Sequence, residues 1–220
     1  MVTALDEIAR HRIVPVVIAR SVDEGLFIAD ALYEGGLPVA EVTFRTAAAP
    51  AVIQALAERG DVVVGAGTVV SAAQVDVAVA AGARFLVSPG FHPDVAARAA
   101  EHGVPLVAGA VSATEIMAAL AAGITTVKFF PAETSGGLPA LRALAGPFGD
   151  VTFVPTGGID ASNLDEYLAH PQVVAVGGSW MLPRAALEAR DAATIVRSTA
   201  DAVARAAASP QAAPAPRANG

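Results

Sequence analysis

The chain has 220 residues, of which 54% are hydrophobic, 5% aromatic and 16% charged, and its formal net charge is −7. This length allows one large domain or two small ones with a sizeable core, and the acidic balance argues against a nucleic-acid surface. The chain contains no cysteine, which excludes disulfides, thiol catalysis and thiolate metal sites.

The first residues carry charges and lack the apolar core of a signal peptide, and no apolar run approaches the ~20 residues that cross a bilayer. Together with the absence of cysteine, this favours a cytoplasmic protein without membrane association. The histidines have no metal-ligand spacing and stand at His11, His92, His102 and His170. We therefore expect no dedicated metal site.

In chain order, residues 3–11 have the pattern of a short amphipathic helix, and short apolar runs then alternate with helical segments. The apolar runs predict strands at 13–18, 39–44, 61–66, 84–87, 105–107, 125–130, 151–154 and 173–176. The predicted helices cover about 22–34, 48–59, 72–81, 93–101, 113–121, 138–145, 161–168 and parts of 184–206.

Strict alternation of strands and helices predicts a parallel sheet in an α/β fold. Eight such units are the number that closes a single (β/α)8 TIM barrel, here with an N-terminal helix. An open doubly wound sheet is the alternative, although no Gly-x-Gly-x-x-Gly follows the first predicted strand. We expect the barrel to cover residues 1–207 and the Ala/Pro-rich tail 208–220 to be disordered, from its composition.

Lys128 is the only lysine of the chain, beside thirteen arginines, and it lies in the middle of the predicted strand 125–130. An arginine stays protonated at any working pH, whereas a lysine buried among apolar groups can lose its proton and become a nucleophile. The first hypothesis is therefore a lysine that forms a Schiff base. A chance lysine and a structural ion pair remain as alternatives.

The period of two along a strand places Glu41, Thr43 and Arg45 on one face and leaves the other face apolar. The polar face then points into the barrel, and the same parity turns Lys128 inward. Arg45 is suited to hold a substrate carboxylate through its guanidinium, and Glu41 to move protons. Glu41 and Arg45 forming only a structural pair is the alternative.

Two glycine-rich turns end the last two predicted strands, in Pro155-Thr-Gly-Gly-Ile159 and Val176-Gly-Gly-Ser-Trp180. The loops after strands 7 and 8 of such barrels are a frequent phosphate site, because glycine lets backbone N–H groups approach an anion. Ordinary turn chemistry is the alternative. Gly65-Ala-Gly-Thr-Val69 predicts a further tight turn at the same rim, where Thr68 either binds a substrate oxygen or satisfies the local backbone.

With these residues, the chain from about 4 to 206 closely resembles the KDPG aldolases, which act on 2-keto-3-deoxy-6-phosphogluconate or on 4-hydroxy-2-oxoglutarate. The matching stretches, in order, are Glu41-Val-Thr-Phe-Arg-Thr46, Val64-Gly-Ala-Gly-Thr-Val69, Ser88-Pro-Gly90, Val127-Lys-Phe-Phe-Pro-Ala-Glu133, Ala145-Gly-Pro-Phe148, Pro155-Thr-Gly-Gly-Ile159 and Gly177-Gly-Ser-Trp180. The segment Ala108–Thr114 departs from the Thr-Pro-Thr-like turn of the family, which leaves the shape of that loop open.

The resemblance implies a homotrimeric class I aldolase of the Entner–Doudoroff pathway that needs no metal or cofactor. It implies that Lys128 forms the Schiff base and that Glu41 is the general acid and base. By the same resemblance, the pyruvate end of the substrate would contact Arg45, Thr68, Pro89 and Phe130. The phosphate end would contact Thr156, Gly157, Gly158, Gly178 and Ser179.

Several rival functions stay open at this point. The main substrate is either 2-keto-3-deoxy-6-phosphogluconate, 4-hydroxy-2-oxoglutarate or the phosphogalactonate epimer. A phosphate-binding barrel isomerase or epimerase would use similar glycine turns without an imine-forming lysine. A trimeric scaffold with a relic site is the non-enzymatic alternative.

Overall fold

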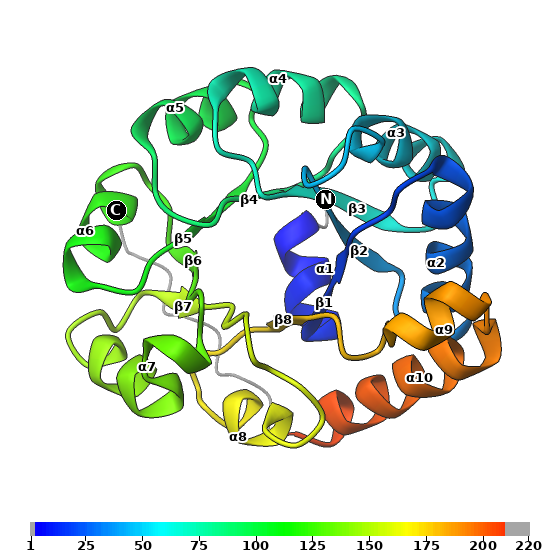
Figure 1. Cartoon of the computed structure of the whole chain (residues 1–220). Helices are drawn as coiled ribbons and strands as arrows, with labels where there is room; N and C mark the ends of the chain where they lie inside the picture. Colours follow the sequence, from blue (N-terminus) through cyan, green and yellow to red (C-terminus); the bar gives the residue numbers. More distant parts are fainter. Residues whose placement is uncertain (1–2, 210–220) are drawn as a thin grey trace.

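The structure, a computed structural model, describes residues 3–209 of the chain. Short strands gather around a centre and helices form the outer ring (Figure 1). The strands are β1 (Ile13–Val17), β2 (Val39–Thr43), β3 (Val63–Gly67), β4 (Leu86–Val87), β5 (Leu106–Gly109), β6 (Thr126–Lys128), β7 (Thr152–Phe153) and β8 (Val176–Gly178). Of the tail predicted at 208–220, Ala208 still belongs to the helix α10 (Ala192–Ala208), and residues 210–220 lie outside the described residues.

The sheet has the order β7-β6-β5-β4-β3-β2-β1-β8, and its paired strands run parallel. Its two ends meet through isolated parallel bridges from Phe153 to Val173 and from Thr156 to Gly177. These bridges join β7 to the β8 segment and close the ring. The predicted (β/α)8 barrel is therefore confirmed.

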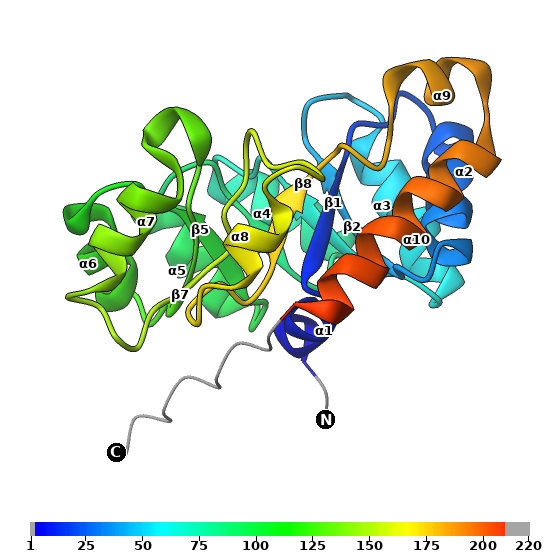
Figure 2. The same ribbon diagram turned by 90° about the horizontal axis from the view of Figure 1, so that it is seen from below.

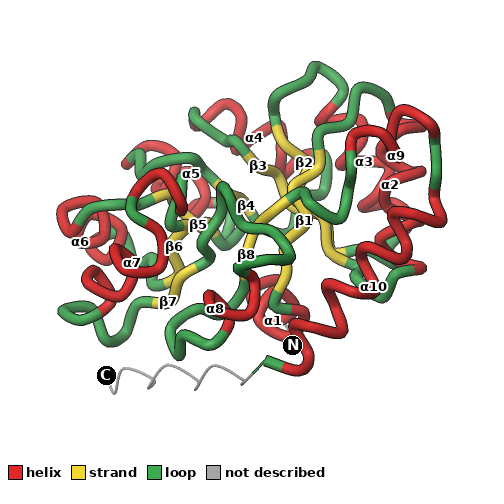
Figure 3. The backbone as a smooth tube through the Cα atoms, turned by 60° about the horizontal axis from the view of Figure 1, so that its bottom comes forward, coloured by secondary structure: helices red, strands yellow, loops and turns green. Residues whose placement is uncertain are grey.

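The connecting helices lie outside the strands (Figure 3). They are α2 (Val22–Glu34), α3 (Ala49–Arg59), α4 (Ala72–Ala80), α5 (Pro93–Glu101), α6 (Ala113–Ala121), α7 (Gly137–Ala145), α8 (Leu164–Leu168), α9 (Arg184–Ala189) and α10 (Ala192–Ala208), with a 3₁₀ turn η1 at Glu133–Ser135. Serine hydroxyls begin α2, α4 and α6 by accepting a backbone N–H three residues further on, at Ser21, Ser71 and Ser112.

The N-terminal helix α1 (Ala4–His11) lies across one end of the barrel (Figures 1 and 2). Thr3 and Asp6 form a reciprocal capping box at its start. Its Ile8 is buried and lines a small cavity inside the barrel. Helix α1 therefore closes the end where β1 begins and leaves the other end open.

The last strand differs from its prediction. The apolar run 173–176 predicts the strand, but Val173 makes only an isolated bridge, and β8 covers Val176–Gly178. The reason is register, because β8 pairs with β1 from Ile13 opposite Val176 to Pro15 opposite Gly178. The apolar run indicates which residues are buried. The strand itself is defined by its pairing with β1, which extends to Gly177 and Gly178.

No helix within residues 3–209 is both long enough and apolar enough to span a membrane. Across the same described range, no three His, Asp or Glu side chains gather as candidate ligands of a metal ion.

Candidate active site

Lys128 and Glu41 meet inside the barrel. Lys128 ends β6 and Glu41 lies in the middle of β2, and the sheet order places three strands between them. The side chains reach across the interior, so that Nζ of Lys128 lies 3.3 Å from Oε1 of Glu41. Lys128 is 6% exposed and Glu41 2%. The prediction that strand parity turns both residues inward is confirmed.

Mostly apolar side chains surround the inner side of the Lys128–Glu41 pair. The cavity below it is lined by both charged residues and Thr156 together with Ile8, Val14, Phe85, Val87, Val107 and Val154. Its volume is about 10 Å³, enough for about one water molecule. An amine and a carboxylate in such surroundings depend on each other, because removing one would leave an uncompensated buried charge.

Gly67 makes room for Glu41. A Cβ atom at position 67 would lie 2.6 Å from Cγ of Glu41, closer than real Cβ contacts come. The sequence predicts a tight turn at this glycine, but Gly67 is the last residue of β3, paired with Thr43. Because Gly67 has no side chain, it leaves room for Glu41 of the neighbouring strand β2. The sequence of β3 alone does not predict this role.

Phe130 lies two residues after Lys128 and is half-buried. The Nζ atom of Lys128 lies 5.0 Å from the centroid of its ring, within the range of a cation–π contact. The ring therefore forms one wall beside the amine, at the open end of the barrel.

Arg45 does not lie in the barrel interior, contrary to the expectation from strand parity. β2 ends at Thr43, and Arg45 stands in the following turn with an exposed side chain. The hydroxyl of Thr43 donates to the carbonyl of Val17 at 3.1 Å. Period-two geometry stops where the strand stops, so the parity that turns Glu41 inward does not extend to Arg45.

Thr68 follows β3 directly and has a φ of 59°, in the left-handed region. A β-branched residue is a genuine outlier there, and such strain clusters at functional sites. Thr68 is half-buried, whereas Pro89, in the loop after β4, is exposed. Both stand at the carboxyl ends of their strands, as Lys128 does at the end of β6.

The two glycine turns lie side by side, since Thr156 bridges to Gly177. Gly157 and Gly158 have φ values of 97° and 82°, which favour glycine. Among the described residues, the backbone N–H groups of Gly157, Gly158 and Ser179 donate to no hydrogen bond. Successive free N–H groups of this kind form a nest for an anion. Thr156 beside them is buried and bonds the carbonyl of Val154.

The loop whose shape the sequence left open is a short turn into α6. The N–H of Ala110 donates to the carbonyl of Lys128 at 2.9 Å, which ties the loop to the lysine strand. Ser112 then begins α6, and its hydroxyl donates to the carboxylate of Glu115 at 2.7 Å.

Two residues that the sequence analysis did not single out lie behind the Gly157–Gly158 turn. The hydroxyl of Tyr167, in α8, donates to Oε1 of Glu133, in η1. Burial and this carboxylate raise the pKa of Tyr167, so that the phenol remains a neutral donor. The two residues are 34 positions apart, so no local pattern connects them.

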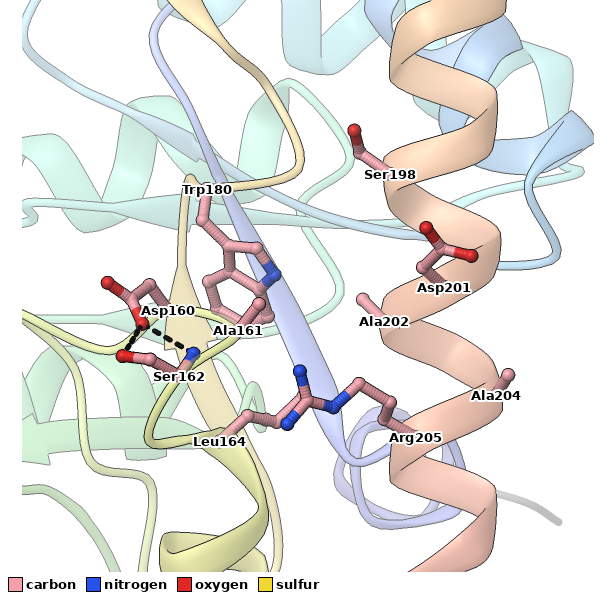
Figure 4. Close-up of a pocket in the computed structure, with 10 residues that line it drawn as sticks. All are labelled: Asp160, Ala161, Ser162, Leu164, Trp180, Ser198, Asp201, Ala202, Ala204 and Arg205. Atoms are coloured by element: carbon pink, nitrogen blue, oxygen red, sulfur yellow. Dashed lines mark hydrogen bonds between the residues drawn. The ribbon is translucent and has the colours of Figure 1, made fainter.

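A larger cavity, of about 740 Å³, lies outside the barrel between α10 and the segment that leads into α8 (Figure 4). Trp180 stands on one side of it, and Asp160 accepts hydrogen bonds from the N–H and hydroxyl of Ser162. Neither Lys128 nor Glu41 lines this cavity. It backs onto the glycine turns, because Asp160 and Trp180 each follow one of them.

The fold and the family match together define an α/β-barrel aldolase. Residues 5–198 match the family model of the KDPG and KHG aldolases, and the chain belongs to this family. An aldolase of this family is a lyase.

Relatives in other organisms agree. The chain is 50% identical to the 2-dehydro-3-deoxy-phosphogluconate aldolase of Treponema pallidum, over 87% of this chain and 91% of that protein. It is 42% identical to the KHG/KDPG aldolase of Escherichia coli, over 87% and 90% of the two chains. The KDPG aldolase of Legionella pneumophila, with pyruvate captured as a covalent carbinolamine, superimposes with a TM-score of 0.87 at 37% identity, over 91% and 98%.

Proposed function

We propose that this chain is a class I aldolase that cleaves 2-keto-3-deoxy-6-phosphogluconate into pyruvate and glyceraldehyde 3-phosphate through an imine on Lys128. The observation that supports this most directly is the buried contact of 3.3 Å between Nζ of Lys128 and Oε1 of Glu41. It pairs a nucleophile with an acid–base group at hydrogen-bonding distance. The covalent carbinolamine of the Legionella pneumophila relative is consistent with the same chemistry.

In the first half of the reaction, the neutral amine of Lys128 attacks the C2 ketone of the substrate. The C–N bond forms, and the ketone oxygen becomes the hydroxyl of a carbinolamine. Glu41, in its protonated form, gives a proton to this hydroxyl, which leaves as water. The product is an iminium ion on Nζ, whose positive charge makes C2 an electron acceptor.

In the second half, the Glu41 carboxylate takes the proton of the C4 hydroxyl, directly or through a water molecule. The C4 oxygen forms its carbonyl, the C3–C4 bond breaks, and its electron pair moves into the iminium to give an enamine. Glyceraldehyde 3-phosphate leaves. Protonation of the enamine at C3 and hydrolysis of the imine release pyruvate and restore Lys128. The iminium accepts the electrons, so the scheme requires no metal.

The two ends of the substrate are held by different parts of the rim. We assign the pyruvate carboxylate to Arg45 and Thr68, and the walls around it to Pro89 and Phe130. The exposed Arg45 guanidinium has no hydrogen bond to any described residue, so its paired N–H groups are available to a substrate carboxylate. The strained backbone of Thr68 supports a role for that residue too.

We assign the phosphate to the nest made by both glycine turns. The residues concerned are Thr156, Gly157, Gly158, Gly178 and Ser179. The free N–H groups of Gly157, Gly158 and Ser179 support this assignment, because they offer three donors to phosphate oxygens.

Relatives named KHG/KDPG aldolase favour 4-hydroxy-2-oxoglutarate as a second substrate. Its distal group is a carboxylate, which the same nest would accept with fewer hydrogen bonds. A comparison of kcat/KM for the two substrates and for the phosphogalactonate epimer ranks them. In cells we expect the enzyme to act in the Entner–Doudoroff pathway. We also propose a homotrimer, which light scattering would show as three times the mass of the chain.

Reduction with borohydride in the presence of pyruvate tests the imine. We expect one covalent adduct, mapped by peptide mass spectrometry to Lys128, and none in Lys128→Arg. The sequence makes the result easy to interpret, because Lys128 is the only lysine. If folded protein carries no adduct on Lys128 after reduction with pyruvate, the proposal is overturned.

A further inference from the structure

The side chain of Glu133 is fixed behind the Gly157–Gly158 turn. Glu133 begins η1, five residues after Lys128, and Tyr167 stands in α8 with 1% of its surface exposed. The phenol hydroxyl donates to Oε1 of Glu133. The same oxygen lies beside Gly137, where a Cβ atom would be 3.3 Å from it and 3.5 Å from the phenol oxygen. The carboxylate is therefore held at its far end by Tyr167.

The stem of Glu133 lies against the turn itself. A Cβ atom at Gly158 would be 2.5 Å from Cγ of Glu133 and 2.7 Å from its Cβ. The backbone N–H of Glu133 also donates to the carbonyl of Gly157 at 3.1 Å. The backbone and the aliphatic part of Glu133 thus contact the Gly157–Gly158 turn, and its carboxylate binds Tyr167 of α8.

All three carbonyls of the turn are bound from outside. The carbonyl of Thr156 accepts from the N–H of Ala132 at 2.8 Å, and that of Gly157 from Glu133. The carbonyl of Gly158 accepts from the side-chain amide of Asn163 at 3.0 Å. In a trans peptide the C=O and the following N–H point in opposite directions. The N–H groups of Gly157 and Gly158 are therefore turned away from Ala132 and Glu133.

The charge of Glu133 needs to be held in place as well. A carboxylate next to the nest would repel a phosphate if it turned towards it. The hydrogen bond from Tyr167 keeps this carboxylate on the outer side, near Gly137.

From these contacts we propose that Tyr167 and Glu133 are positioning residues that hold the Gly157–Gly158 turn in its phosphate-binding form and so set the affinity for phosphorylated substrates, a role that rests on the function proposed above. Neither residue would touch the reacting carbon atoms. Their effect is expected on the phosphate end of the substrate and not on imine chemistry at Lys128.

The test compares three variants, Tyr167→Phe, Glu133→Gln and Tyr33→Phe. Tyr167→Phe keeps the ring and removes the donor, whereas Glu133→Gln keeps an oxygen that accepts from the phenol. Tyr33→Phe changes the only other tyrosine, an exposed residue of α2, and serves as the control. The readouts are KM for 2-keto-3-deoxy-6-phosphogluconate, inhibition by inorganic phosphate, deuterium exchange of the pyruvate methyl group, and Tm.

For Tyr167→Phe we expect KM to rise about 3- to 10-fold, the range for loss of one hydrogen bond, with inhibition by phosphate weakened in parallel. Exchange of the pyruvate methyl group, which needs the imine but no phosphate, should stay within about 2-fold of the unmodified chain. Glu133→Gln should lie between Tyr167→Phe and the unmodified chain, and Tyr33→Phe should match the latter.

Two results would overturn the proposal. One is an unchanged KM and phosphate inhibition in Tyr167→Phe. The other is an equal loss of cleavage and pyruvate exchange in that variant, which would show a purely structural role. Failure of the unmodified chain to exchange pyruvate would instead contradict the imine mechanism, so the two proposals fail in distinguishable ways.

Discussion

Gly67 provides the space that the side chain of Glu41 occupies. A Cβ atom at position 67 would lie 2.6 Å from Cγ of Glu41 and 2.7 Å from its carboxylate carbon. Two adjacent parallel strands therefore share one volume, in which β3 contributes no side chain and β2 contributes the carboxylate that we propose as the acid–base group. The position of the Glu41 carboxylate relative to Lys128 therefore depends on a residue without a side chain.

Gly67→Ala should therefore lower kcat by about 100-fold, because a displacement of about 1 Å at a catalytic group has effects of this size. The measurement is pyruvate release coupled to lactate dehydrogenase, with circular dichroism to confirm folding. Gly149→Ala is the matched control, since Gly149 is exposed and nothing lies within 4 Å of a Cβ atom there. An unchanged kcat in Gly67→Ala would show that Glu41 needs no such clearance.

Lys128→Arg should fold normally and lose turnover by roughly six orders of magnitude, the size of loss that removal of a covalent nucleophile produces. The substitution retains a positive charge next to Glu41, so the loss would report the missing amine and not a broken ion pair. Steady-state cleavage assays at high enzyme concentration measure it. Retention of more than a tenth of the activity would contradict the Schiff-base role.

Glu41→Gln should separate imine formation from proton transfer. We expect turnover to fall by about 10²- to 10⁴-fold, the usual contribution of a general acid–base group. Borohydride should still trap pyruvate on Lys128 in this variant, although more slowly. Full turnover in Glu41→Gln would mean that another group or water carries the proton.

Arg45→Ala should raise KM for the substrate about 10- to 100-fold, because hydrogen bonds to a charged group contribute about 1.5–3 kcal/mol. The change in kcat should be smaller, since Arg45 would bind the carboxylate in the ground state and the transition state alike. Arg84→Ala is the control, an exposed arginine just before β4. Equal effects of the two substitutions would refute a specific role for Arg45.

Chelation provides a test that needs no mutation. In the proposed mechanism an iminium on Lys128 accepts the electron pair, so EDTA should leave the rate of cleavage unchanged. The measurement is activity after dialysis against EDTA, compared with dialysis against buffer alone. Inhibition that zinc restores would instead indicate a mechanism in which a metal ion polarises the ketone.

The barrel and its central pair follow from local patterns. Apolar runs alternate with helical segments along the whole barrel, and such alternation admits few topologies. The inward orientation of Lys128 and Glu41 follows from parity, because each lies within a strand that is regular up to that residue. Arg45 shows where parity fails, since β2 ends two residues earlier and the turn reorients the chain.

Other features depend on contacts between distant segments. The register of β8 is set by β1, at the other end of the sequence, so the apolar run at 173–176 places the strand too early. The hydrogen bond between Tyr167 and Glu133 and the clearance at Gly67 also join different units of the barrel. A single sequence carries no local sign of such pairs, because each partner looks ordinary in its own segment.

Trp180 is the only tryptophan of the chain, and its ring packs directly on Gly178 while one side borders the cavity in Figure 4. All tryptophan fluorescence of the protein therefore originates next to the turn at the end of β8. A ligand that orders this turn would change the emission, and a small quencher in the cavity would report how far the indole is shielded. The molecule thus carries a single intrinsic fluorophore, with which binding at the proposed phosphate site could be followed in time without a label.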